Sequence, residues 1–275
     1  MKTVILLFAL SACFGLLVWF LYDQNNRLCI SKHVVSSEKF HSSFSGIHLS
    51  DLHNKSFGRR NERLLKAIRE LKPDIIFYTG DVIYKRSSDY RAGIRFLYDV
   101  SQIAPVYMIL GNHECEYAQR EEVIRKIRET GVHLLINQSA ELHIKDNLIQ
   151  LFGMAERLIS KPEVMQLAET FEKKRDYKIL LSHFPHYFSH YRKVQYQEYQ
   201  FDLILCGHTH GAQMILPLIG GICAPQQGLF PKYYRGLYEE NGTKMIVSRG
   251  LGKSIFPFRI FNRPEIIQIH FEPQR

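Results

Sequence analysis

The sequence lacks the paired or closely spaced cysteines of a disulfide framework. Its 275 residues contain five cysteines, an odd number, with no C-x-x-C spacing. They are Cys13, Cys29, Cys115, Cys206 and Cys223. Repeats and low-complexity segments are also absent. With 45% hydrophobic and 23% charged residues, the chain has ordinary globular composition and is long enough for one sizeable α/β domain. We therefore interpret the cysteines as small buried or incidental thiols.

A dense run of lysine or arginine and an additional capping domain are missing as well. The formal net charge is nevertheless +9. Such a charge can favour an anionic membrane surface or an anionic substrate, and a solvated basic face explains it equally well. Sequence-independent binding of nucleic acid needs a long basic groove, so nucleic acid is not an expected partner.

One long hydrophobic run stands near the N-terminus. Residues 4–22 are nineteen uncharged residues, and a helix of that length spans roughly 28 Å, close to the hydrocarbon thickness of a bilayer. Trp19 and Tyr22 suit a membrane interface. A cleaved signal peptide and a lipoprotein cleavage before Cys13 fit less well, because the apolar run continues nine residues beyond Cys13. We expect an uncleaved, single-pass membrane anchor.

The domain organisation follows from this run. We expect the anchor and its flanks over residues 1–27, a polar, serine-containing linker over 28–43, and one domain over 44–275. Lys2 precedes the apolar run and Arg27 is the first basic residue after it. The positive-inside tendency then favours a cytoplasmic N-terminus and an extracytoplasmic domain, although two lysines in the expected linker oppose it.

From residue 44 onward, short apolar runs alternate with segments of helical spacing. The order β-α-β-α-β-α, followed by mixed strands and further βα units, indicates an α/β layered domain. Strands are expected at 45–50, 74–79, 106–110, 177–181, 201–206 and 265–271, with two or three more between 132 and 154 and a hairpin over 235–248 at Asn241-Gly242. Helices are expected at 60–71, 90–103, 117–130 and near 162–173.

Five of the expected strands each end in a short polar cluster. The clusters are Asp51-x-His53, Gly80-Asp81, Gly111-Asn112-His113-Glu114, His183, and Gly207-His208-Thr209-His210. Ligands of such sheets gather beyond the carboxyl ends of the strands, so the clusters are expected to converge. Strand alternation should turn residues i and i+2 toward a common centre, and the glycines should allow the tight turns between them. Each cluster alone could be a polar loop, but together they indicate a metal site.

In this order the clusters resemble the motifs of the calcineurin-like metallophosphoesterases, over residues 44 to about 215. The resemblance implies a four-layer αββα sandwich that holds two divalent metal ions. It implies that Asp51, His53 and His210 hold the first ion and that Asn112, His183 and His208 hold the second, with Asp81 bridging both. His113 would bind no metal but would lie over the substrate and help to protonate the leaving oxygen.

The residue types agree with that implied assignment. Mixed carboxylate, amide and imidazole ligands suit manganese, our first candidate, or iron or zinc, rather than calcium. Two such ions can lower the pKa of a water molecule and stabilise phosphoryl oxygens. An imidazole such as that of His113 has a pKa near working pH, which suits an acid.

The segment after His210, with "SRGLG" and "RPE" further on, resembles the membrane-anchored bacterial branch of the family, which is similar to UDP-2,3-diacylglucosamine hydrolases. Tyr84, Ala212 and His186 depart from residues that are frequent in such relatives. None of the three is an implied metal ligand, so the departures leave the substrate open rather than the chemistry.

Several other polar residues have weaker claims. His186 and His190 have the i, i+4 spacing of a helical metal site, but we interpret them as surface histidines because the site already has its ligands. The remaining histidines without a motif are His33, His41, His48, His133, His143 and His270. Arg59, Arg60, Lys232 and Arg235 could contact a phosphate, with a solvated basic face as the default interpretation.

The expected function is hydrolysis of a phosphoester or pyrophosphate bond by metal-activated water. A tethered enzyme is matched to a lipid-linked or envelope substrate, so the expected partners are that substrate and the membrane. A generic phosphodiesterase or nuclease-like hydrolase and a non-catalytic scaffold on the same fold are the alternatives. All seven implied ligands and His113 are present, which speaks against a decayed scaffold.

Overall fold

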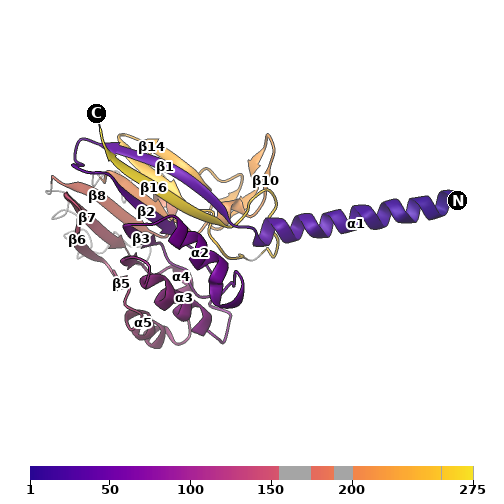
Figure 1. The fold of residues 1–275 in the computed structure, drawn as a ribbon, viewed down its shortest axis with the longest axis horizontal. Helices are drawn as coiled ribbons and strands as arrows, with labels where there is room; N and C mark the ends of the chain where they lie inside the picture. The colour runs from indigo at the N-terminus through magenta and orange to yellow at the C-terminus, as the bar shows by residue number, and fades with distance from the viewer. Residues whose placement is uncertain (155–174, 189–200, 255, 275) are drawn as a thin grey trace.

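The structure, a computed structural model, describes residues 1–154, 175–188, 201–254 and 256–274. Two six-stranded sheets pack face to face (Figure 1). The first sheet has the order β1 (Cys29–Ser37), β16 (Glu265–Pro273), β2 (Phe44–Leu49), β3 (Ile75–Tyr78), β4 (Val106–Met108) and β5 (His133–Leu134). The second has the order β14 (Gly236–Glu240), β15 (Thr243–Val247), β9 (Leu203–Cys206), β8 (Tyr177–Ser182), β7 (Asn147–Met154) and β6 (Gln138–Ile144).

Helices cover the outer face of the first sheet. They are α2 (Glu62–Glu70), α3 (Arg91–Ser101), the short α4 (Asn112–Cys115) and α5 (Arg120–Arg128) (Figure 1). In α2, Leu64, Leu65 and Ile68 share one face and are buried against the sheet, and the helix ends shortly before Pro73. The helical spacing in the sequence thus predicts which face enters the core.

Alternation along the strands separates two cores. In β3, Ile75 and Phe77 belong to the core between the two sheets, whereas Ile76 and Tyr78 belong to the core under the helices. Successive side chains of a strand point to opposite faces, and both faces of this strand are covered. This is why the whole run is apolar rather than alternating.

The expected α/β architecture with two central sheets is confirmed, and the described helices and strands lie close to their predicted residues. The hairpin at Asn241-Gly242 joins β14 to β15. None of the five cysteines forms a disulfide bond. The helix expected near 162–173 lies outside the described residues. The structure adds two short strand pairs, β10 (Ile215–Leu216) with β11 (Gly220–Gly221) and β12 (Cys223–Ala224) with β13 (Gly228–Leu229).

The prediction of a linker over residues 28–43 is wrong for most of that range. Residues 29–37 form β1, which pairs in parallel with β16 at the edge of the first sheet. Its inward positions include Ser31 and His33, and only Val35 is a fully buried apolar residue. Because polar residues occupy much of the inward face of this edge strand, hydrophobic alternation in the sequence is too weak to reveal it.

The N-terminal run forms one exposed helix, α1 (Lys2–Asn26), which projects away from the sheets (Figure 1). An 18-residue stretch of this helix has a mean hydropathy of 2.7, so the helix is long and apolar enough to cross a membrane. Only Arg27 and Leu28 separate it from β1. The helix therefore joins the domain without a long free stalk.

Two neighbouring valines test whether β1 belongs to the folded core. Val35 is fully buried between the sheets, whereas Val34 is 56% exposed. Val35→Asp should destabilise the protein by roughly 3–5 kcal/mol, because it leaves a buried charge without a partner. Val34→Asp is the matched control and should change the thermal midpoint little. Equal midpoints of the two variants in detergent would show that the segment is a linker after all.

Candidate metal centre

The polar clusters meet at one edge of the two sheets. Asp51 follows β2 and Asp81 follows β3, both in the first sheet. His183 follows β8, and His208 and His210 follow β9, both in the second sheet. Carboxyl ends of parallel strands in both sheets therefore supply the site, as the sequence predicts.

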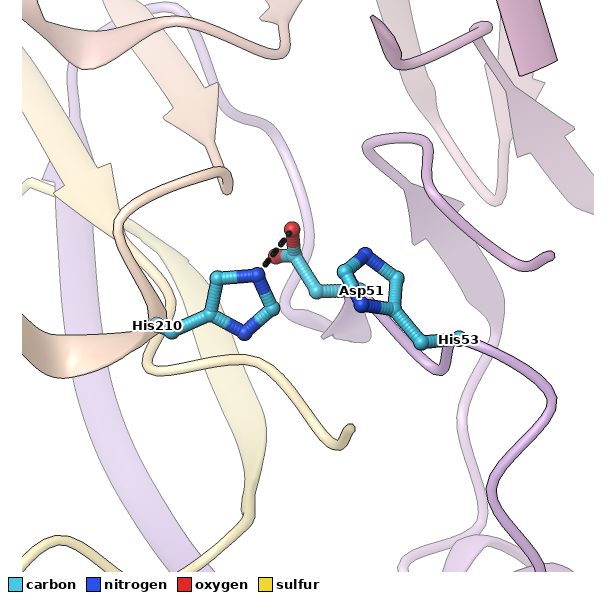
Figure 2. A group of neighbouring side chains, drawn as sticks. All are labelled: Asp51, His53 and His210. Atoms are coloured by element: carbon cyan, nitrogen blue, oxygen red, sulfur yellow. Dashed lines mark ion pairs between the residues drawn. The ribbon is translucent and has the colours of Figure 1, made fainter. Parts of the chain in front are cut away.

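Three groups of possible metal ligands form there, each with its ligand atoms within 4.8 Å of one another. They are Asp51, His53 and His210; His53, Asp81 and His113; and Asp81, His183 and His208. Figure 2 shows the first group, with the Asp51 carboxylate beside the two imidazole rings. The Nε2 atom of His210 lies 3.6 Å from Oδ1 of Asp51.

Asp81 connects the groups. Its Oδ2 atom lies 3.2 Å from Nε2 of His53 and 3.1 Å from Nε2 of His183. It also lies 3.9 Å from Nε2 of His113. One carboxylate thus faces imidazoles from three different segments of the chain.

The backbone at these residues differs from the strand geometry that the sequence suggests. Asp51 and His53 lie beyond the end of β2, and their φ angles are +54° and +50°. Asp81, His208 and His210 also have positive φ. Left-handed turns bring these side chains together. The prediction that alternation along a strand turns residues i and i+2 toward a common centre is therefore wrong. His208 and His210 even join different ligand groups.

The glycines contribute in two ways. Gly80 has a φ of +86°, which favours glycine and supports the expected tight turn before Asp81. Gly207 does not have a positive φ, but a Cβ atom there would overlap the side chains of Ser50 and Asp51. Gly111 is extended, and a Cβ atom there would overlap the Asp81 carboxylate. At these two positions close approach, rather than a turn, requires glycine.

Charges in the site oppose burial. Burial disfavours ionisation of Asp81, but the neighbouring His183 and His53 rings hold its pKa well below the usual range. Burial disfavours the imidazolium of His183, yet Asp81 and Asp51 raise the pKa of His183 to about 9. Burial and the charge of His183 lower the pKa of His208 well below its usual value. Asp81 is therefore ionised and His208 neutral, as metal binding requires, whereas the raised pKa of His183 favours its protonated form, and a cation on that ring would displace the proton.

Several buried polar atoms of the site have no hydrogen-bond partner. They are Oδ1 of Asn112, Nε2 of His183, Nε2 of His208 and Nδ1 of His210. Nε2 of His183 lies near Asp81 but not at a hydrogen-bonding angle. Buried polar atoms are normally satisfied, and together with the carboxylates these atoms form a donor set that suits divalent cations. The residues present thus fit the two divalent metal ions that the sequence resemblance implies.

Two of the imidazoles are oriented by backbone carbonyls. Nδ1 of His183 lies 2.6 Å from the carbonyl oxygen of Thr79, and Nδ1 of His53 lies 2.6 Å from that of Lys253. Each contact assigns a hydrogen to Nδ1 and turns Nε2 toward Asp81, where that nitrogen could bind a cation.

Glu114 has a structural role that sequence reasoning missed. Its buried carboxylate accepts hydrogen bonds from the backbone N–H groups of Asp81, Ile83 and Gly111 at 2.8–3.0 Å. Burial and the nearby Asp81 charge raise the pKa of Glu114 to about 7. The cluster Gly111-Asn112-His113-Glu114 contains this residue, but a motif alone gives no signal for which loop its side chain holds.

Arg259 was also missed. Its guanidinium is fully buried and donates to the carbonyl oxygens of Arg249 and Gly252 at 2.8 and 3.0 Å. Leu251, in the loop that it holds, donates its N–H to the carbonyl of Ser50, directly before Asp51. A buried arginine that binds only carbonyls has no periodic signature in a sequence.

His113 lies at the edge of the metal centre, in contact with solvent. Its Nδ1 atom accepts a hydrogen bond of 3.0 Å from the N–H of Lys85, so the neutral ring carries its hydrogen on Nε2. Its ring stacks on those of His53 and Tyr84, with centroids 4.2 and 5.0 Å away. Burial and the neighbouring imidazoles outweigh Asp81 and lower the pKa of His113 to about 4.

A pocket of about 210 Å³ opens over the site. Besides Asp81, Asn112, His113, His208 and His210, its lining includes Tyr84, Lys85, Arg86, Glu116, Pro225, Gln226 and Ser254. None of Arg59, Arg60, Lys232 and Arg235 lines this pocket. The basic residues that line it are instead Lys85, which forms an ion pair with Glu116, and Arg86.

The expectation of a surface position is wrong for His186. Only 7% of this residue is exposed, and its ring centroid lies 6.3 Å from that of His208. Its 3-10 helix (Pro185–Phe188) begins two residues after His183 and turns inward. His190 lies outside the described residues. His48 is buried, and its Nε2 lies 2.8 Å from the hydroxyl of Thr79.

Sequence comparison relates the chain to known metallophosphoesterases. Residues 47–212 match the family model of the calcineurin-like phosphoesterases. The chain is 26% identical over 254 residues to YkuE, an uncharacterized metallophosphoesterase of Bacillus subtilis, covering 89% of this chain and 86% of that protein. It is 26% identical over 232 residues to the phosphodiesterase YaeI of Escherichia coli, covering 82% of this chain and 81% of that protein.

A transmembrane protein with metallophosphoesterase domain from Danio rerio is 27% identical over 248 residues, covering 84% of this chain and 54% of that protein. The family model spans more than half of the present chain, including the clusters after β2, β3, β4, β8 and β9. The chain therefore belongs to the calcineurin-like phosphoesterase family.

Proposed function

We propose that this metal-dependent phosphoester hydrolase uses the ligand groups at the sheet edge to hold two divalent ions. Asp51, His53 and His210 hold one ion, Asn112, His183 and His208 hold the other, and Asp81 contacts both. One observation carries this proposal. Members of both ligand groups face the carboxylate of Asp81, and several buried nitrogen and oxygen atoms of these groups have no hydrogen-bond partner. Manganese is the first candidate, with iron or zinc as alternatives.

Divalent cations, when bound, supply Lewis-acid activation of water and of the phosphoryl group. The protein residues have separate tasks. The carboxylates of Asp51 and Asp81 offset the positive charge, and the backbone contacts of His53 and His183 keep their Nε2 atoms available. At the pocket wall Lys85 is paired with Glu116, so Arg86 is the basic residue whose charge favours an anionic substrate.

His113 has the position of a group that acts on the substrate. It lines the pocket, and its Nε2–H is free to donate to a phosphoryl or leaving oxygen because Lys85 occupies Nδ1. Because its pKa is lowered to about 4, the ring is neutral at pH 7 and donates a hydrogen bond from Nε2 to the leaving oxygen. To protonate that oxygen the ring would first take up a proton, which the negative charge of a bound phosphoester favours.

Removal of the shared carboxylate tests the metal assignment. The wild-type protein, purified full-length in detergent and supplied with Mn²⁺, should hydrolyse bis-p-nitrophenyl phosphate or p-nitrophenyl phosphate. Asp81→Asn should lose metal from both positions and lose activity, because one carboxylate faces both ligand groups. Elemental analysis gives the metal content per chain.

Asp74→Asn is the matched control, since Asp74 precedes β3 and Asp81 follows it. Asp74 accepts a hydrogen bond from the N–H of Ser45, away from the site, so its variant should keep both metals. Full metal content in Asp81→Asn would contradict the assignment. A wild-type protein that binds metal but hydrolyses no phosphoester would be a scaffold.

Truncation of the pocket histidine tests its separate role. His113→Ala should keep both metals but lower turnover by roughly 10²–10⁴-fold, as expected for loss of a proton donor. His143→Ala, at an exposed position on β6, should leave turnover unchanged. If His113→Ala loses as much metal as Asp81→Asn, His113 is a ligand instead.

We further propose a lipid-linked or envelope phosphoester as substrate, as in the membrane-anchored branch similar to UDP-2,3-diacylglucosamine hydrolases. The exposed anchor α1 and the similarity to a transmembrane-named relative support a membrane setting. The phosphodiesterase named among the relatives favours a diester. A screen of lipid phosphates, nucleotide diphosphate sugars and cyclic nucleotides with Mn²⁺ should favour the first two classes. Cyclic nucleotides as the best substrates would support the generic phosphodiesterase.

The outward orientation of the domain stays a prediction from the flanking charges. Protease added to intact cells should remove a C-terminal tag; a protected tag would place the domain in the cytoplasm.

A further inference from the structure

Exposed apolar side chains gather on two loops of the domain. Among the described residues that follow α1, eleven large hydrophobic side chains are exposed, and seven of them lie in these two loops. The 214–231 loop contributes Leu218, Ile219, Leu229 and Phe230, and the 256–261 loop contributes Phe256, Phe258 and Phe261. Leu218 is fully exposed at the turn between β10 and β11, and Phe230 is 64% exposed. Such clustering marks an interaction surface rather than scattered surface residues.

The two loops are joined to each other and to the membrane helix. Met214 and Ile260 form a β-bridge, and the N–H of Ile215 donates to the carbonyl of Ile260 at 3.0 Å. The ring of Phe261 packs edge-on against Phe20 of α1, with centroids 5.3 Å apart. Figure 1 shows β10 beside the end of α1 that meets the domain. The apolar loops therefore lie next to the C-terminal end of the anchor.

The junction between α1 and the domain is fixed by polar contacts. Nε of Arg263 donates to Asp23 at 2.9 Å, and the N–H of Arg259 donates to the side chain of Asn25 at 3.2 Å. Lys55 also donates to the backbone carbonyl of Asn25. Asn25 is only 5% exposed. These contacts set the direction in which the domain leaves the helix.

The same loops border the pocket over the metal centre. Pro225 and Gln226 of the 214–231 loop line it, together with Ser254, which directly precedes the second loop by sequence. Pro257 of the second loop lines an adjoining pocket with His53. The apolar tips and the mouth of the site thus belong to one structural unit.

We propose that the 214–231 and 256–261 loops form a membrane-docking surface, whose apolar tips enter the interfacial region of the bilayer beside α1. The occupant is a lipid surface because the patch is continuous with the anchor: Phe261 contacts Phe20, one residue after Trp19 at the interface end of the apolar run. The docked loops hold the mouth of the pocket at the level of the phospholipid headgroups. The access of a lipid-linked phosphoester that follows rests on the proposed function; the docking itself does not.

Depth-dependent quenching tests the docking without any enzymatic reaction. Full-length protein with Cys13→Ser and Cys223→Ser, the two exposed cysteines, receives a single new cysteine and an environment-sensitive fluorophore. The labelled positions are Leu218→Cys, Phe230→Cys and, as the control, Asp146→Cys in the turn between β6 and β7. The vesicles contain phosphatidylcholine and phosphatidylglycerol with a fraction of doxyl-labelled lipid.

Fluorophores at 218 and 230 should be quenched several-fold more strongly than the fluorophore at 146. Equal quenching at all three positions would overturn the proposal. Shielding of 218 and 230 from a water-soluble quencher without quenching by doxyl lipid would also overturn it, in favour of a second copy of the chain or another protein on this surface.

Activity supplies a second readout. Leu218→Asp combined with Phe230→Asp should lower turnover of a phosphatidyl p-nitrophenyl diester in vesicles by roughly tenfold, because charged tips oppose insertion. Turnover of soluble bis-p-nitrophenyl phosphate should stay unchanged. Tyr98→Asp is the control. Tyr98 is also an exposed large hydrophobic residue but lies on α3, so this variant should change turnover of neither substrate.

These arms separate the two proposals. If no variant hydrolyses bis-p-nitrophenyl phosphate, the proposed function is contradicted. The predicted quenching pattern would still support docking in that case. An equal loss of turnover on both substrates in the double variant, without a change in quenching, would overturn the role of the loops at the membrane.

Discussion

The hydrogen bonds that fix the backbone and side chain of Asp81 determine the geometry of the rest of the site. The carboxylate of Glu114 accepts the backbone N–H of Asp81 at 2.8 Å, and Oδ1 of Asp81 accepts the N–H of His113 at 2.8 Å. Oδ2 is thereby turned toward His53 and His183, which come from different sheets. One short segment after β4 thus fixes both the backbone and the side chain of the residue on which the two candidate ligand groups converge. A shift of Asp81 would disturb both groups at once.

This arrangement stores strain at the site. Asp51, His53, Asp81, His208 and His210 all have positive φ, and a sparsely populated backbone conformation costs of order 1–3 kcal/mol for each such residue. The loops are nevertheless over-determined: the N–H of Asp51 donates to the carbonyl of Gly80 at 3.0 Å, and that of His53 to the carbonyl of Asp81 at 3.1 Å. The two large cores beneath them supply the stability that holds these turns in place. Such contacts hold the ligand side chains in one orientation.

The sequence predicts which residues gather at the candidate site but not the forces that place them. Carboxylate, amide and imidazole after successive strands are a chemical pattern, so Asp51, Asp81 and His208 can be found by type and spacing alone. The turn geometry cannot, because positive φ in a non-glycine residue is imposed by tertiary contacts rather than by the residue itself. Glu114 and Arg259 were missed for a related reason, since their partners are backbone groups that leave no mark in the sequence. The sequence does not predict β1 because Ser31 and His33 occupy inward positions that apolar residues usually fill.

The short connection between α1 and β1 changes what the anchor does. A long flexible linker would raise only the local concentration of the enzyme near the membrane, with every orientation of the pocket sampled. Here only Arg27 and Leu28 intervene, and Asp23 and Asn25 are bound to the domain. The direction of the helix therefore sets the direction of the pocket, and the apolar loops that border the pocket lie beside the C-terminal end of the helix. In the proposed docked state, Lys85 and Arg86 would face phosphate groups that diffuse in the plane of the membrane, and the net charge of +9 would add attraction to an anionic surface. Binding then requires the headgroup to reach the site by lateral diffusion rather than by leaving the bilayer, which avoids the large cost of exposing acyl chains to water.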